Sequence, residues 1–307
     1  MKKLRIVVSL ITTDNDYQRE QASAAEDTAR RLDVDLQVMY ADNDSITQSQ
    51  QLLKIIQDTT SDVDGIVVEP AGGTTFPQVA RAAVARGMAW VVLNRDVEYI
   101  SELRRSFRVP ILAVGSDHEE IGRIHGGQLA AILPNGGSVL YIQGPSASTV
   151  SQQRTAGILD TKPANISLKM LKSATWTEES GHRAISAWLR LSTAHTERVE
   201  AIVAQNDSIV MGAKKAFEQG TSGKEREKWC SLPCLGVDGL PKTGQTWVRQ
   251  GLLTATVIVL PNTIPALEAL VQAIRTGSLP PERTLIPPKS FPDIESLAAT
   301  FARSVQA

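Results

Sequence analysis

At 307 residues the chain is longer than a typical single domain, which favours two domains. Its formal net charge of -1, with 21% of residues charged, excludes the broadly basic surface that nucleic-acid binding usually needs. No apolar run approaches the roughly 20 residues that a membrane-spanning helix requires.

The N-terminus resembles a secretory signal peptide only in part. Lysines at 2–3 precede an apolar run at 4–11, and Ala-Ser-Ala at 22–24 resembles a cleavage site. The intervening residues 14–20 are too polar for the apolar region of a signal peptide. We therefore expect residues 4–11 to form a buried strand, and either a leader absent from this sequence or a cytoplasmic protein.

The first half of the chain alternates short apolar runs with amphipathic stretches of helical length. The runs at 66–68 and 91–93 are apolar without alternation, as in strands that are covered on both faces of a parallel sheet. The predicted strands are 5–11, 36–40, 65–69 and 90–94, and the predicted helices are 18–32, 45–59 and 76–86.

The same alternation begins again at residue 138. The predicted strands are 138–143, 167–173, 201–204, 235–238 and 255–260, and the predicted helices are 150–159, 177–192, 209–219 and 263–276, with Gly277 closing the last. Two βα series in tandem predict two doubly wound α/β domains.

Polar residues follow several of these strands, at the carboxyl ends where doubly wound sheets bind ligands. Both halves of the chain contribute, so a site built from these residues would lie between the domains. They are Asn15, Tyr17, Asn94, Arg95, Gln143, Gly144, Asn206, Asp207 and Asp238.

Cysteine and histidine give no sign of a metal or redox site. Cys230 and Cys234 lack a second pair and the spacing of a redox motif, so we expect free or incidentally paired thiols. The four histidines are scattered along the chain and are expected to be exposed, which argues against a metal site. They are His118, His125, His182 and His195.

Several short motifs together resemble the signatures of type I periplasmic binding proteins. Each is weak alone, but they cover nearly the whole chain in the expected order, and the resemblance is close to ribose-binding and related sugar-binding proteins. The motifs are AQNDSIVMGA at 204–213, LGVDG at 235–239, LTATVIVLP at 253–261, VVLNR at 91–95, GSD at 115–117 and the R-x-x-G at 154–157.

The resemblance implies two parallel-sheet lobes joined by a three-stranded hinge, with crossovers near Ser116, Leu260 and residues 287–288. The implied lobes are residues 1–116 plus 261–288 and residues 117–260 plus 289–307. They would close around a ligand, without any cofactor.

The resemblance also assigns eight ligand-binding positions. Amides, a carboxylate and a guanidinium offer hydrogen bonds to hydroxyl groups, and two aromatic rings can stack on the apolar face of a sugar. We therefore expect a small polar ligand, a sugar or a polyol. The eight positions are Asn15, Tyr17, Asn94, Arg95, Gln152, Trp176, Asn206 and Asp238.

The chain departs from the ribose-type pattern at four positions. That pattern has Asp where Asn94 stands, a second Arg at Gln152, Gln at Val259 and an aromatic residue at Gln18. A pocket built for particular hydroxyls rejects molecules that lack them, because buried polar groups are then left unpaired. Ribose itself is therefore not the expected ligand, whereas a hexose, a deoxy sugar, a cyclitol or a nucleoside remains open.

Three polar or aromatic residues near these motifs have a structural interpretation. Asp207 and Asp117 are predicted to cap the helices that follow them. Trp188 falls on the inner face of the helix at 177–192 and is predicted to be core.

The predicted function is capture of a solute for an ABC-type permease by a monomeric protein, periplasmic by resemblance, that is not an enzyme. A ligand sensor acting alone or feeding a membrane kinase or chemoreceptor is the alternative. A nucleotide-dependent enzyme is a weaker one, because the chain lacks a P-loop, a Gly-x-Ser-x-Gly elbow and a G-x-G-x-x-G after the first strand. A repressor of the lactose type would need a DNA-binding headpiece before the strand that begins by Arg5.

Overall fold

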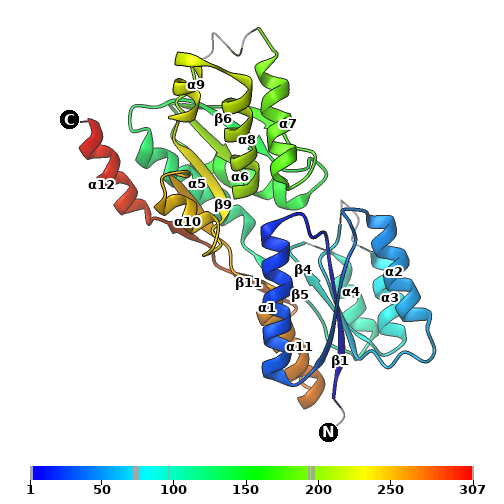
Figure 1. Cartoon of the computed structure of the whole chain (residues 1–307). Coiled ribbons are helices and arrows are strands. Elements are labelled where there is room, and N and C mark those ends of the chain that lie inside the picture. Colours follow the sequence, from blue (N-terminus) through cyan, green and yellow to red (C-terminus); the bar gives the residue numbers. More distant parts are fainter. Residues whose placement is uncertain (1–2, 72–75, 96, 193, 195–197, 306–307) are drawn as a thin grey trace. The chain divides into compact units, whose positions relative to one another are not determined.

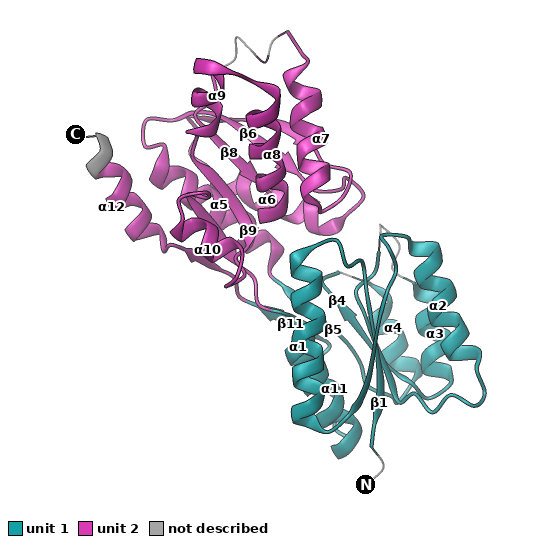
Figure 2. Cartoon of the chain, in the orientation of Figure 1, with its two compact units in different colours: residues 1–116, 261–286 teal, residues 117–260, 287–307 magenta. Residues whose placement is uncertain are grey.

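A computed structural model describes the chain except for residues 1–2, 72–75, 96, 193, 195–197 and 306–307 (Figure 1). The chain divides into two compact units (Figure 2). Unit 1 is Met1–Ser116 with Pro261–Ile286, and unit 2 is Asp117–Leu260 with Pro287–Ala307. The chain thus passes between the units three times, and its third passage follows Ile286, slightly earlier than the predicted boundary at residue 288.

Unit 1 contains a six-stranded parallel sheet in the order β11-β5-β4-β3-β1-β2. The direction of winding reverses between β1 and β3, which is the point where such sheets bind ligands beyond the carboxyl ends of their strands. The strands are β1 (Arg5–Leu10), β2 (Asp35–Tyr40), β3 (Gly65–Val68), β4 (Ala89–Leu93), β5 (Ile111–Ser116) and β11 (Arg283–Ile286).

Helices cover both faces of this sheet (Figure 1). Helices α1 (Asp16–Leu32) and α11 (Thr263–Thr276) cover one face, and they bury alanines and leucines against alternate residues such as Val8. Helices α2 (Ser45–Gln57), α3 (Pro77–Ala85) and α4 (Tyr99–Ser106) cover the other face, where Val7 and Trp90 are buried. The unbroken apolar strands follow from this two-sided burial.

Unit 2 repeats the arrangement in the order β12-β10-β9-β8-β6-β7, with β12 antiparallel to β10. Its winding reverses between β6 and β8. The strands are β6 (Gly137–Gln143), β7 (Ile166–Lys172), β8 (Ala201–Ala204), β9 (Cys234–Asp238), β10 (Ala255–Ile258) and β12 (Lys289–Phe291). Two parallel-dominated sheets wound with helices confirm the predicted fold class.

The helices of unit 2 also form two layers. One core contains Trp188, Phe217 and Trp229, and the centroids of their rings lie within 6.3 Å of one another. Trp188 is therefore confirmed as a core residue. The other core lies under α5, α6 and α12. The helices are α5 (His118–Ile132), α6 (Thr149–Thr161), α7 (Glu178–Leu189), α8 (Asp207–Gly220), α9 (Gly223–Cys230), α10 (Gly244–Arg249) and α12 (Ile294–Val305).

Glycines let two helix pairs of unit 2 approach closely. A Cβ atom on Gly212 of α8 would collide with the carbonyl oxygen of Glu178 on α7, and one on Gly181 of α7 would collide with the carbonyl of Ile209. Gly157 of α6 faces α5 in the same way. Because α8 begins directly after β8, this contact fixes the helix end next to the predicted ligand-binding Asn206.

Candidate functional site

Two of the predicted ligand-binding residues in unit 1 lie at the start of α1. Asn15 caps this helix, and its Oδ1 accepts the N–H of Gln18 at 3.2 Å. The Tyr17 hydroxyl accepts the side-chain amide of Gln21 at 3.2 Å and that of Asn262 at 3.3 Å. Both predicted residues are almost completely buried.

Asn94 lies directly after β4 and connects several parts of unit 1. Its backbone has a φ of 54°, in the left-handed region that Asn tolerates better than most residues. Its Oδ1 accepts the N–H of Ser116 at 3.4 Å and the amide of Asn262, while its Nδ2 donates to Glu69 at 3.2 Å. The structure therefore brings Asn94 and Tyr17 together through Asn262.

Arg95 is held beside these groups. Its Nη1 donates to the carbonyl of Asn94 at 2.9 Å, whereas its Nε is buried and bonds to none of the residues that the structure describes. Burial lowers the pKa of Arg95, and the negative charge of Glu69 opposes that decrease. A guanidinium with an unused buried N–H is suited to bind an oxygen atom of a ligand.

Glu69 was not among the predicted site residues. It follows β3 at the switch point of the sheet and is only 4% exposed. Its two carboxylate oxygens accept the side-chain amides of Gln18 at 2.9 Å and of Asn94 at 3.2 Å. An acidic residue at the end of an apolar run was the available signal, but a strand end alone explains such a residue equally well.

Two predicted residues of unit 2, Asn206 and Trp176, lie in direct contact. Asn206 caps α8, with its Oδ1 accepting the N–H of Ile209 at 2.8 Å, and its Nδ2 donates to the carbonyl of Trp176 at 2.9 Å. The Trp176 ring lies against Gly144, where a side chain would collide with it, and 5.6 Å from the guanidinium of Arg154. An aromatic ring is thus fixed beside the carboxyl ends of β6 and β8.

Asp207 does not cap α8, because Asn206 does, so that prediction was wrong. Its carboxylate instead accepts the Thr256 hydroxyl at 2.7 Å and the Gly239 N–H at 2.9 Å. The absence of a side chain on Gly236 leaves the space that this carboxylate occupies. Asp207 therefore has a structural role, as predicted, although it bonds to β10 and Gly239 and does not cap a helix. Asp117 does cap α5 as predicted, because its Oδ1 accepts the N–H of Glu120 at 2.9 Å.

Asp238 and Gln152 complete the predicted set in unit 2. Asp238 ends β9 with a φ of 105° and is 7% exposed, and its carbonyl accepts the N–H of Val259 at 3.0 Å. Gln152 lies exposed on α6, and its Nε2 donates to the carbonyl of Ser146 at 3.2 Å. Asp238 is thus placed at a strand end like the other candidates, while Gln152 points its amide at its own loop.

The prediction that the histidines are exposed was wrong for His118 and His125. Both are buried on α5, and burial lowers the pKa of His125, whose Nε2 lies 3.0 Å from the carbonyl of Gly236, to about 4. A helix with several glycines has a weak amphipathic pattern, which hid its inner face. His195 lies outside the described residues. In the described part of the chain, no three His, Cys, Asp or Glu side chains are arranged to hold a metal ion.

The two cysteines are free thiols in the structure. Burial raises the pKa of Cys234 to about 11, and burial also raises the pKa of Cys230. A thiol with a pKa of about 11 is almost entirely protonated at neutral pH, so Cys234 is not suited to act as a nucleophile.

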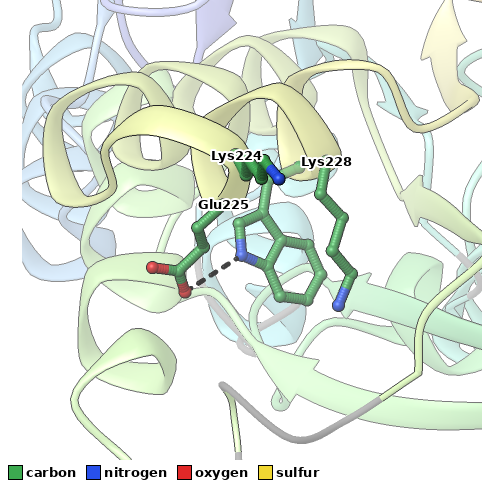
Figure 3. Close-up of a pocket in the computed structure, with 4 residues that line it drawn as sticks. Lys224, Glu225 and Lys228 are labelled. Carbon is green, nitrogen blue, oxygen red and sulfur yellow. Dashed lines mark hydrogen bonds between the residues drawn. The ribbon is translucent and has the colours of Figure 1, made fainter.

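A surface hollow of about 340 Å³ lies on α9 (Figure 3). The Trp229 indole donates to Glu225 at 3.4 Å, and the Lys228 ammonium lies 4.3 Å from the centre of the indole ring. Helix α9 precedes β9, so its last residues lead to the amino end of that strand. The hollow is therefore separate from the residues that follow the carboxyl ends of the strands, and its Glu225 and Lys228 side chains already contact Trp229.

Comparison with known proteins defines the class of the chain. Residues 6–275 match the family described as periplasmic binding protein domain, and the chain belongs to this family. No helix in the described residues has the length and apolar character needed to cross a membrane.

Two curated relatives are sugar-binding proteins by name. The chain is 30% identical to a D-ribose/D-allose-binding protein of Pseudomonas aeruginosa over 201 residues, which cover 65% of this chain and 58% of that protein. It is 23% identical to the ribose import binding protein of Bacillus subtilis, over 87% of this chain and 79% of that protein.

A solved structure shows the same fold over nearly the whole chain. It is a periplasmic solute-binding protein of an ABC transporter from Actinobacillus succinogenes with bound D-allose. The TM-score is 0.81 at 23% identity, and the match covers 97% of this chain and all of that one.

Proposed function

We propose that this protein binds one uncharged sugar or polyol without chemically changing it and delivers the molecule to an ABC-type permease in the periplasm. The observation that carries the proposal is the repeated placement of buried or half-buried polar groups at the carboxyl ends of both sheets. Asn94 and Arg95 occupy this position in unit 1, and Asn206 and Asp238 occupy it in unit 2. Such groups present fixed donors and acceptors to hydroxyls.

The family and the names of its relatives support the ligand class. A sugar offers many hydroxyls and one apolar face, and Trp176 supplies the ring that such a face requires. The eight positions assigned from the resemblance, Gln152 included, are proposed as the ligand contacts. A ligand that binds groups of both units stabilises the state in which all of them reach it, and closure of the units follows from that difference in affinity.

A thermal-shift screen tests the proposal. The purified protein is heated with D-allose, D-ribose, xylitol and myo-inositol, and with nucleosides and amino acids as the competing classes. At a hundredfold excess over the dissociation constant, a ligand stabilises the folded state by ~2.7 kcal/mol, which gives a visible shift of the melting temperature. A shift with a sugar or polyol supports the proposal. A shift restricted to nucleosides or amino acids replaces its ligand class.

A further inference from the structure

Two of the departures from the ribose-type pattern meet at one side chain. Gln18 stands where an aromatic residue was expected, and Asn94 stands where Asp was expected. Each presents its amide nitrogen to a different oxygen of Glu69, at 2.9 Å and 3.2 Å. The two departures therefore belong to a single arrangement around a buried carboxylate.

The carboxylate fixes how both amides are oriented. An ionised carboxylate only accepts hydrogen bonds, so both amides must turn their NH₂ groups toward Glu69. The opposite oxygens are also used, since Gln18 Oε1 accepts the N–H of Ile11 at 3.0 Å and Asn94 Oδ1 accepts the N–H of Ser116 at 3.4 Å. The amide of Asn94 is left with a second N–H, which is available as a donor to a ligand.

Glu69 also supplies the negative charge that the pattern expects at position 94. Arg95 follows Asn94 directly, and the charge of Glu69 raises the pKa of its guanidinium against the effect of burial. With Asp at 94 in place of Asn, two carboxylates would lie within hydrogen-bond distance of each other, which is unfavourable when both are ionised. A glutamate at 69 and an amide at 94 are thus mutually consistent.

We propose that Glu69 is a specificity-determining, positioning residue. It orients Asn94 and Gln18 as donors and balances the charge of Arg95, so that this half of the site selects uncharged ligands over sugar acids. The inference rests on the proposed function. It makes Glu69 act through its neighbours, with no need for direct contact to the ligand.

The test uses three variants and a control. Glu69→Gln removes the charge, Asn94→Asp adds one beside it, and the double variant Glu69→Gln/Asn94→Asp moves the carboxylate from 69 to 94. Asp tolerates the left-handed backbone at this position as Asn does. Glu26→Gln, an exposed change on α1, controls for the loss of one charge.

Titration calorimetry measures the affinity of each variant for D-allose and for D-gluconate. If another sugar or polyol of the panel gives a larger thermal shift than D-allose, that molecule is used in place of D-allose. Glu69→Gln should weaken binding of the neutral ligand about tenfold, the equivalent of 1.4 kcal/mol. It should also reduce the ratio of the affinity for the neutral ligand to the affinity for gluconate. Asn94→Asp alone should bind weakly at pH 7.5 and recover toward pH 5, where one carboxyl becomes protonated. The double variant should bind the neutral ligand better than either single variant.

Unchanged affinity and selectivity in Glu69→Gln, or a double variant weaker than both single variants, would overturn the inference. A readout without ligand separates it from the proposed function. The changes in melting temperature of the two single variants should not add up to that of the double variant, because the two side chains interact. If the wild type binds nothing in the panel, the proposed function fails. The melting temperatures then decide the role of Glu69: non-additive changes support its coupling to Asn94, and additive changes contradict it.

Discussion

Asp207 provides the sharpest stability prediction in unit 2. Its buried carboxylate holds the hydroxyl of Thr256 on β10 and the N–H of Gly239, the residue after the candidate ligand contact Asp238. We expect Asp207→Ala to destabilise unit 2 strongly and Asp207→Asn to do so mildly, because only the alanine leaves both donors without an acceptor.

The magnitude follows from these two bonds. Leaving a buried donor unsatisfied costs about 1–3 kcal/mol, so the loss of both acceptors in Asp207→Ala should lower the free energy of unfolding by roughly 2–6 kcal/mol. Asparagine keeps the shape, its Oδ1 can accept from Gly239, and its amide can donate to the Thr256 oxygen. The remaining loss is the difference between charged and neutral hydrogen bonds, about 1–2 kcal/mol.

Urea unfolding followed by tryptophan fluorescence measures both variants. Trp90 is the single tryptophan of unit 1, so a Trp90→Phe background makes the signal report on unit 2, where Trp188 and Trp229 are buried. A loss below about 1 kcal/mol in Asp207→Ala would refute the assigned hydrogen bonds, since it is less than one unsatisfied donor costs. An asparagine variant as unstable as the alanine variant would contradict the compensation argued here.

Two further predictions concern packing and pH. Gly212→Ala should lower the free energy of unfolding by about 3 kcal/mol, at the upper end for overpacking, because its Cβ would meet the Glu178 carbonyl on α7. Gly251→Ala is the control: nothing lies near this position, so it should lose only the ~1 kcal/mol that its positive φ costs. Equal losses in the same urea assay would contradict the close helix contact. The pKa of His125 is lowered from 6.5 to about 4 in the folded state, so the unfolded chain takes up the proton first as pH falls. The free energy of unfolding should therefore drop by up to ~3 kcal/mol between those pH values, and His125→Asn should lack this component; identical pH profiles of the two proteins would show that His125 is not buried in its neutral form.

The fold was largely predictable because most strands are short apolar runs that end at polar residues. β8 and α11 match their predicted ranges, and most of the others differ by one to three residues at an end. The segment containing α4, β5 and α5 was not assigned by periodicity, nor were α9, α10, β11, β12 and α12. β5 begins with four consecutive apolar residues directly after a proline and carries the same signal as the other strands, whereas α5 contains three glycines and has a weak amphipathic pattern. Its inner face, with His125, became clear only from packing.

The candidate site was predictable where a single strand end defines it. Asn94, Asn206 and Asp238 each follow or end an apolar run, and the structure places each of them at the carboxyl end of a strand. Glu69 was missed because its importance depends on Gln18 and Asn94, which are distant in sequence. Relations among residues on three different elements leave no periodic signal in one sequence.

The central claim is that this protein binds an uncharged sugar or polyol through groups such as Asp238. Titration calorimetry of the wild type and of Asp238→Asn tests it, because asparagine tolerates the positive φ of this position better than alanine does. The account predicts one-to-one binding of D-allose or of another neutral sugar or polyol, and at least tenfold weaker binding by Asp238→Asn at an unchanged melting temperature. Absence of binding to all of these sugars and polyols, or equal affinity in the variant, would contradict it.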